Sequence, residues 1–164
     1  MVELMVVLAI AAILSTLATP SFRGILRSYR MTGAANDLLA AVNLTRAEAI
    51  ARGSRVDIVP NSGGWANGWT IFTDKNGNQT RDTDEQLIFS HGPLPDGMTI
   101  TTTFDPQTPQ FVAYNATGRS RSNSSAQATR AGSWLLTLDG ESRKVVINFL
   151  GRARVCNPAT DSSC

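Results

Sequence analysis

Hydrophobic positions change their spacing twice along this chain. Residues 2–19 are apolar or small except for Glu3, a run close to the ~20 residues with which a helix spans a bilayer. After Pro20, apolar and small side chains recur at three- and four-residue steps, which is the pattern of an amphipathic helix. The positions on this stripe are Met31, Ala35, Leu38, Val42, Thr45 and Ala49. Because glycine commonly ends helices, Gly53 predicts one helix from about residue 2 to residue 52.

From residue 54 onward the hydrophobic spacing falls to two, which is the period of a strand with one buried face. Turn sequences rich in Gly, Pro, Asn and Asp separate the candidate strands, and an Asp-Gly pair at 139–140 gives the strongest hairpin signal. The candidate strands are residues 55–59, 69–73, 86–90, 98–104, 110–114, 133–138 and 143–150. Residues 120–133 are poor in hydrophobic side chains and are expected to form a mobile loop. This order predicts an α+β fold in which one long N-terminal helix packs on an antiparallel β-sheet.

The length of 164 residues leaves room for one folded domain. We divide the chain within the predicted helix. Residues 1–27 are expected to form the transmembrane or filament-core half of the helix. Residues 28–164 are expected to form the soluble domain, in which the amphipathic half of the helix runs to about residue 52 and the sheet follows.

Charge is segregated along the soluble part. Residues 57–105 hold seven acids and two bases, whereas residues 118–154 hold seven bases and two acids. The basic part could bind a polyanion. The alternative is that folding interleaves the two parts, so that their fields cancel and the bases are ordinary surface charges.

Both cysteines lie in the last nine residues, at Cys156 and Cys164. A close pair predicts a disulfide if the domain sits in an oxidising compartment. Such a short loop would contribute roughly 2–3 kcal/mol at most and would hold down the C-terminal tail. A metal site is a poorer interpretation, because the sole histidine, His91, is remote in sequence and two thiolates do not complete a tetrahedral site.

The N-terminal stretch VELMVVLAIAAILSTLATPSF resembles the first helix of type IV pilins and type II secretion pseudopilins, since Glu3, the apolar run and Pro20 match in place. Met1 departs from the pattern, because the family has Leu there. In that family a short basic leader precedes the motif and keeps the N-terminus inside. The resemblance implies a single-pass inner-membrane protein of a Gram-negative bacterium, with its domain in the periplasm and later in an extracellular pilus.

The resemblance also gives Glu3 an assembly role, in which it pairs with the N-terminal amine of a neighbouring subunit. A carboxylate surrounded by hydrocarbon needs a cation, which makes this pairing physically reasonable. The alternative for Glu3 is a position at the membrane interface, in contact with water. Other major and minor pilins are the implied protein partners.

Three later stretches resemble one branch of this family, the FimT/FimU minor pilins and the related GspH-type pseudopilins. They are RAEAIARGSRV (residues 46–56), GWTIFTDKNGNQTRDTDEQLI (68–88) and INFLGRARV (147–155). With the N-terminal match, the resemblance covers nearly the whole chain. It implies the type IV pilin fold.

Two features bear on metal binding and catalysis. Residues 74–85 place acids and asparagines at the 1, 3, 5, 9 and 12 positions of an EF-hand loop, but the glycine is misplaced and strands flank the loop. A polar hairpin tip, in which Asn and Gly serve the turn, is the favoured interpretation. Nucleophile-elbow and phosphate-loop motifs are absent from the sequence, and His91 has no evident catalytic neighbour. We therefore expect no enzymatic activity, no cofactor and no metal site.

The basic motif Gly151-Arg152-Ala153-Arg154 follows the last long candidate strand. In an extended chain Arg152 and Arg154 would point the same way, ~7 Å apart, and could contact neighbouring phosphates of one DNA strand. Gly151 would permit a turn. Further bases that would widen this patch are Arg119, Arg121, Arg143 and Lys144. Few aromatic residues lie near it, so stacking on single strands is not expected.

FimT-type pilins that act in natural transformation bind DNA through a C-terminal Gly-Arg-x-Arg motif, which Gly151, Arg152 and Arg154 match residue by residue. The resemblance thus implies a minor type IV pilin that binds extracellular double-stranded DNA non-specifically for uptake. The same motif at 118–121 lies outside the family position. Two alternatives stay open: a structural minor pilin that primes pilus assembly without binding DNA, and a type II secretion pseudopilin.

Overall fold

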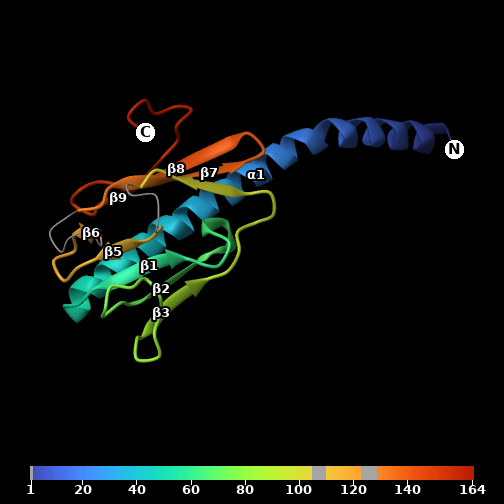
Figure 1. Cartoon of the computed structure of the whole chain (residues 1–164). Coiled ribbons are helices and arrows are strands. Elements are labelled where there is room, and N and C mark those ends of the chain that lie inside the picture. Colours follow the sequence, from blue (N-terminus) through green and yellow to red (C-terminus); the bar gives the residue numbers. More distant parts are fainter. Residues whose placement is uncertain (1, 105–109, 123–128) are drawn as a thin grey trace.

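The computed structural model describes residues 2–104, 110–122 and 129–164, except for the side chains of residues 13–21 and 23. One helix, α1, runs from Val2 to Arg52, as predicted. It ends in a Schellman motif, because Gly53 has φ +62° and its N–H donates to the Ile50 carbonyl (3.2 Å) while Ser54 N–H donates to the Ala49 carbonyl (3.3 Å). Figure 1 shows the first half of α1 projecting beyond the sheets and the second half lying against them.

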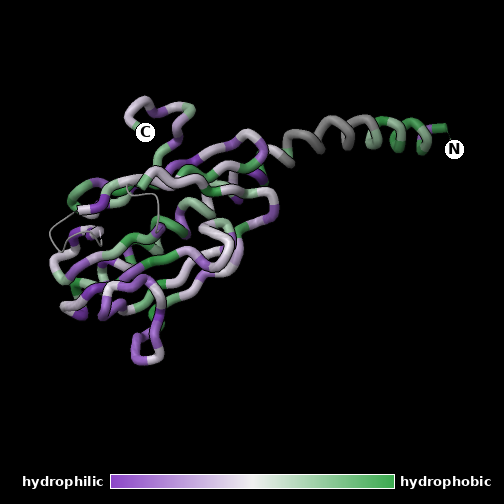
Figure 2. The backbone as a smooth tube through the Cα atoms, viewed as in Figure 1, coloured by the Kyte–Doolittle hydropathy of each residue, from purple (hydrophilic) through white to green (hydrophobic). Residues whose placement is uncertain are grey.

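The two halves of α1 bury their side chains differently. Every position of the predicted stripe is fully buried, from Met31 to Ala49. Near the N-terminus, by contrast, the apolar side chains are exposed, Val2 at 74% and Ile10 at 53%, and this segment is hydrophobic in Figure 2. Among the residues that the structure describes, no helix carries an apolar stretch long enough to cross a membrane.

The strands form two antiparallel sheets that both pack on α1, where a single sheet was expected. The first sheet has the order β3-β2-β1-β5-β6, with β1 Val56–Pro60, β2 Trp69–Thr73, β3 Leu87–His91, β5 Val112–Tyr114 and β6 Ser120–Arg121. The second has the order β4-β7-β8-β9, with β4 Thr99–Thr102, β7 Gly132–Leu138, β8 Glu141–Ile147 and β9 Ala153–Cys156. The α+β class with a helix on antiparallel sheet is confirmed.

Several elements differ from the sequence prediction. Strands β6 and β9 and a short 3-10 helix, Trp65–Asn67, were not predicted. Strand β8 ends at Ile147 rather than at 150, because the next residues form a turn. The expected loop at 120–133 begins with β6 and ends in β7, and its middle, 123–128, lies outside the described residues, as does the turn predicted at 105–109.

The core lies between the second half of α1 and the two sheets. Trp134 of β7 is fully buried and meets Trp65 and Phe104 edge-on, with ring centroids 5.1 and 4.7 Å apart. These aromatic rings belong to the same hydrophobic core as the buried alanines of α1. Of the predicted DNA-binding residues, Arg119, Gly151 and Arg152 lie in turns, and the others lie on β6, β8 and β9.

Candidate nucleic-acid interface

Two hairpins of the structure end in the same kind of turn. One joins β5 to β6 and has the sequence NATGR (115–119); the other joins β8 to β9 and has the sequence NFLGR (148–152). In each, the asparagine N–H donates to the arginine carbonyl at 3.1 Å. The glycine N–H donates back to the asparagine carbonyl, at 2.8 Å for Gly118 and 2.9 Å for Gly151. We call these two segments the paired turns.

The asparagine side chains fix the arginines of the paired turns. Asn148 Oδ1 accepts hydrogen bonds from the N–H groups of Leu150 and Arg152, both at 3.0 Å. Asn115 Oδ1 accepts in the same way from Thr117 N–H (3.2 Å) and from the N–H of Arg119 (3.1 Å). In such a turn the asparagine side chain accepts hydrogen bonds from backbone N–H groups that lack a carbonyl partner within the turn. The two arginines therefore leave equivalent turns at equivalent positions.

The paired turns pack against each other through their glycines. Gly151 has φ +75°, and a Cβ atom there would lie 2.7 Å from Tyr114 Cε1 and 2.9 Å from the Gly118 carbonyl oxygen. The buried Tyr114 hydroxyl donates to the Gly151 carbonyl at 2.9 Å. Burial raises the pKa of Tyr114 above its usual range, although the charge of Arg46 opposes this, so the hydroxyl stays protonated and keeps donating. Only glycine fits this contact.

Arg119 and Arg152 follow the two glycines directly, and both are exposed. In the part of the chain that the structure describes, neither guanidinium makes an ion pair or a side-chain hydrogen bond. Figure 1 places the paired turns at the end of the domain where α1 ends, far from the N-terminus. These two arginines are therefore available to an external anion.

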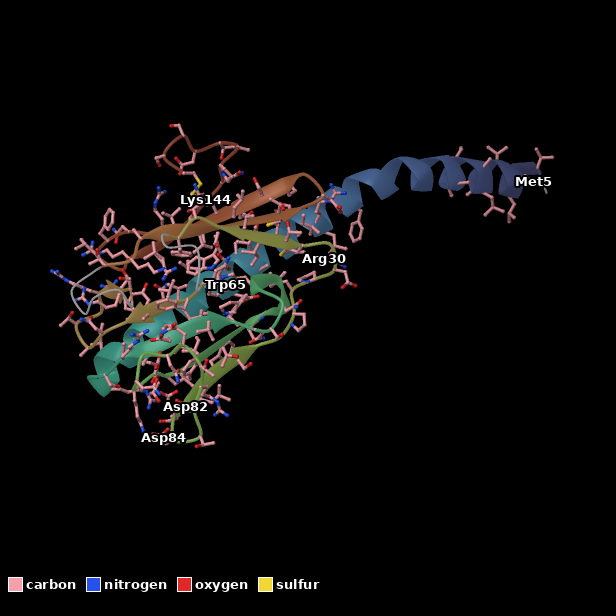
Figure 3. The ribbon with its side chains drawn as sticks, viewed as in Figure 1. Met5, Arg30, Trp65, Asp82, Asp84 and Lys144 are labelled. Atoms are coloured by element: carbon pink, nitrogen blue, oxygen red, sulfur yellow. A yellow bond between two sulfur atoms is a disulfide. The ribbon has the colours of Figure 1, made fainter. Side chains whose placement is uncertain are left out.

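Unlike Arg119 and Arg152, the predicted bases Arg154 and Lys144 bind the C-terminal loop, residues 157–164. The predicted disulfide between Cys156 and Cys164 is present. Arg154 donates to the Ser163 carbonyl at 2.5 Å and lies 3.6 Å from Asp161, while Lys144 Nζ donates to a Cys164 oxygen at 2.8 Å. Figure 3 shows Lys144 beside this loop. Arg152 and Arg154 thus have different surroundings, although an extended chain would have presented them as a matched pair.

Asp161, the acid in this loop, is ionised. Hydrogen bonds from Ser163, and to a smaller extent the charge of Arg154, hold the pKa of Asp161 below its ordinary value. The side chain of Arg154 is half exposed, but its positive charge is partly neutralised by Asp161.

The remaining predicted bases are half-buried. Arg143 lies 3.8 Å from Glu141 and donates to the Ser142 carbonyl at 2.7 Å. Arg121 belongs to β6, next to the paired turns, and also has partners within the protein. The structure brings Arg119, Arg121 and Arg152 to one corner and places Arg143 farther along β8.

Sequence reasoning missed three contributors to this corner. A Cβ atom on Gly118 would lie 3.1 Å from Nε of Arg46, so a cation of α1 stands behind the paired turns. The asparagine three residues before each glycine was also missed, although the repeated pattern N-x-x-G-R-x-R was the signal that could have found it. The third is Phe149, which is 68% exposed beside Arg152, where few aromatic residues were expected.

The loop with EF-hand spacing uses its buried carboxylates to organise its own backbone. Asp74 accepts hydrogen bonds from the N–H groups of Gly77 (2.6 Å) and Gln79 (3.0 Å). Glu85 accepts from the N–H groups of Lys75 (2.7 Å) and of Asp82 (3.0 Å). These bonds favour the hairpin-tip interpretation. Three or more potential metal ligands do not gather anywhere in residues 2–104, 110–122 and 129–164.

The acidic part of the chain pairs with other bases than those of the paired turns. Arg55 holds the buried Asp57 in two hydrogen bonds of 2.7 and 2.6 Å and lies 3.5 Å from Asp74. Lys75 pairs with Asp84 at 3.0 Å. In Figure 3 Asp82 and Asp84 lie on the opposite side of the domain from Lys144. Within the described residues, none of these acids forms an ion pair with Arg119 or Arg152.

A family model described as "Type II transport protein GspH" matches residues 34–151, which is more than half of the chain. The chain belongs to the GspH family. The match spans the buried half of α1, most of both sheets and the glycines of both paired turns. A comparison of this GspH-family chain with curated proteins found no match.

Solved structures of minor pilins and pseudopilins share the fold of this GspH-family chain. The type IV minor pilin FimU of Pseudomonas aeruginosa superposes with a TM-score of 0.59 at 17% identity, covering 81% of this chain and 92% of FimU. The minor pseudopilin EpsH from the type 2 secretion system of Vibrio cholerae gives a TM-score of 0.56 at 15% identity, covering 79% and 98%. The chain therefore has the type IV pilin fold, and family and fold together support a minor pilin or pseudopilin.

Proposed function

We propose that this protein is a minor type IV pilin that binds extracellular double-stranded DNA non-specifically, for uptake in natural transformation. One observation carries the proposal: two equivalent turns, packed together, present the guanidiniums of Arg119 and Arg152 at the end of the domain, without partners among the described residues. Arginine suits such a site, because its planar fork matches phosphate oxygens.

Binding would be electrostatic. Arginines that neutralise phosphates release condensed counterions, and this term does not depend on base sequence. Residues 112–122 and 142–160, which contain both hairpin turns, have no acid, and the acids that flank them, Glu141 and Asp161, lie beside Arg143 and Arg154 rather than beside Arg119 or Arg152. With so few free cations one subunit would bind weakly, and several subunits in one pilus would compensate through avidity.

The other predicted site residues would support these two arginines. Gly151 allows the close contact of the turns, and Arg121 and Arg143 add positive charge. Arg154 and Lys144 bind the disulfide loop and would add positive charge to the β8–β9 hairpin that carries Arg152.

We place the first half of α1 in the inner membrane before assembly and in the filament core afterwards, with the domain in the periplasm. The exposed apolar side chains of the described N-terminal residues support this, since they need a hydrocarbon or protein environment. The disulfide supports an oxidising compartment. In this setting Glu3, which is exposed in the single chain, would pair with the terminal amine of the next subunit.

A second candidate function is a purely structural role among other pilins, or in a type II secretion pseudopilus. The same exposed apolar segment favours it, because assembly needs that segment and no nucleic acid. The family description includes type II transport. The arginines of the paired turns would then be solvated surface charges.

The test is DNA binding by the full chain in a non-ionic detergent, measured as fluorescence anisotropy of a labelled duplex at low and moderate salt. The double variant Arg119→Gln, Arg152→Gln is expected to lose binding. The matched control is Arg30→Gln, Arg81→Gln, which removes the same charge from two exposed arginines outside the paired turns. An equal loss in both variants, or no wild-type binding at low salt, would favour the structural role.

A further inference from the structure

The tip of the β8–β9 turn carries two apolar side chains that the turn itself does not need. Phe149 is 68% exposed and Leu150 is 51% exposed. The β5–β6 turn adopts the same hydrogen-bonded conformation with Ala116 and Thr117 at the equivalent positions. A single exposed apolar residue is ordinary on a protein surface, but two adjacent ones at a turn tip, beside cations without partners among the described residues, form a candidate contact for an external group.

Phe149 is also set apart from the other aromatic residues of the sheet domain. Within the described part of residues 56–164, Trp65, Trp134, Phe104 and Tyr114 are buried, and the next most exposed ring, Phe89 on β3, is 40% exposed. The core of the domain is complete without Phe149.

Several hydrogen bonds constrain the backbone of the turn that carries Phe149. Asn148 closes it with backbone and side-chain hydrogen bonds to Arg152, and the Tyr114 hydroxyl holds Gly151 from behind. A ring presented on a fixed backbone loses little conformational entropy when a flat partner stacks on it.

The charges around the ring bear on what kind of partner it would contact. Arg152 lies in the same turn and Arg119 in the neighbouring one, both exposed and unpartnered within the described residues, and both turns are free of acids. Aromatic rings beside free cations are the elements that bind unpaired nucleotides, since the ring stacks on a base and the cations hold the flanking phosphates. A blunt duplex offers no free base face except at its ends. A purely apolar protein contact would not explain two uncancelled arginines at the same place.

We infer that the β8–β9 turn is a base-stacking tip, in which Phe149 stacks on an unpaired base while Arg119 and Arg152 hold adjacent phosphates. The protein then prefers DNA with single-stranded overhangs or frayed ends over blunt duplex. This rests on the proposed DNA binding and names the form of DNA that the same site takes.

The experiment compares two labelled probes, a blunt duplex and the same duplex with a single-stranded overhang, on the full chain in non-ionic detergent. The overhang probe should bind more tightly by about 5- to 150-fold, the range that stacking of one base on an aromatic ring contributes. Phe149→Ala should remove this preference, so that the overhang probe binds no more tightly than the blunt duplex, whereas Phe149→Trp should keep it. Phe89→Ala is the matched control, because it deletes another exposed ring, on β3 at the edge of the first sheet opposite β6.

A fluorescent base analogue in the overhang gives a second readout, since stacking quenches it. Quenching by the wild type and not by Phe149→Ala supports the inference. Equal binding of both probes, unchanged in Phe149→Ala, overturns the inference and leaves the proposed function standing. Failure of both probes to bind removes the proposed function as well. If Phe149→Ala weakens binding to other pilins and leaves the overhang preference intact, the ring is a protein contact and the inference is wrong.

Discussion

Single residues decide whether the paired turns can meet. Gly151 has a positive φ and lies against both Tyr114 and the Gly118 carbonyl. Both the backbone conformation and the lack of space for a Cβ atom therefore demand glycine at this position. Gly140, in the β7–β8 turn, meets only the first demand. It has φ +87°, and a Cβ atom there would find open space within 4 Å beyond its chain neighbours.

Gly151→Ala should therefore be much more harmful than Gly140→Ala. We expect Gly140→Ala to cost about 1 kcal/mol of unfolding free energy, from backbone strain alone. Gly151→Ala should cost at least about 2 kcal/mol, because a contact below 3 Å to backbone must also be relieved. Urea unfolding of both variants measures this difference. Equal costs would mean that the turns do not pack as described.

At the scale of elements, the disulfide loop between Cys156 and Cys164 is attached to the second sheet through two basic side chains. The cysteines are eight positions apart, so the closed loop is short. Lys144 and Arg154, from β8 and β9, bind oxygens of this loop, while the two strands pair with each other over four residue pairs. The sheet does not depend on the loop for its hydrogen bonds.

Replacing both cysteines by serine should leave the fold intact and lower the free energy of unfolding by about 2–3 kcal/mol, as expected for a short loop in the chain-entropy account. Residues 157–164 should exchange their amide hydrogens faster, while those of β8 and β9 stay protected. Calorimetry and hydrogen exchange measure the two effects. Loss of protection across β8 and β9 would contradict this independence.

The short strands β6 and β9 were not predicted from the sequence, and the reason is physical. Strand β2 was predicted with its observed bounds, because the buried Trp69 and Ile71 alternate with the less buried Thr70. Strands β6 and β9 are two and four residues long and carry arginines, so they give no clear hydrophobic alternation. Their pairing is decided by the turns before them. A turn signal in the sequence therefore says more about such strands than their own composition does.

At the scale of the whole molecule, the two charged parts of the chain fold to different places. The acids of the β2–β3 loop pair with Arg55 and Lys75, while the paired turns keep Arg119 and Arg152 free within the described residues. Among the described residues, neither Arg119 nor Arg152 forms an ion pair with an acid of residues 57–105, so the charge of these two arginines stays available for a directed electrostatic field.

The slope of DNA affinity against salt concentration should report how many arginines contact phosphates. The logarithm of the binding constant is expected to fall with the logarithm of the salt concentration, by about 0.9 per phosphate contacted. Arg119 and Arg152 together predict a slope of about −2, and Arg119→Gln should flatten it by about 1. Titrations at several salt concentrations measure the slope. Arg81→Gln should leave it unchanged, and an equal flattening in that variant would show that only net charge matters.

The sequence by itself determined the helix, its buried stripe, most of the longer strands and the disulfide. These features depend on local periodicity or on residues close in the chain, so the pattern of side chains is enough to find them. Only the tertiary structure decided how the strands divide into two sheets and that the paired turns pack glycine to glycine. Both depend on contacts between distant segments, whose partners no local pattern specifies. For the same reason the sequence could not distinguish the free Arg152 from Arg154, which the C-terminal loop engages.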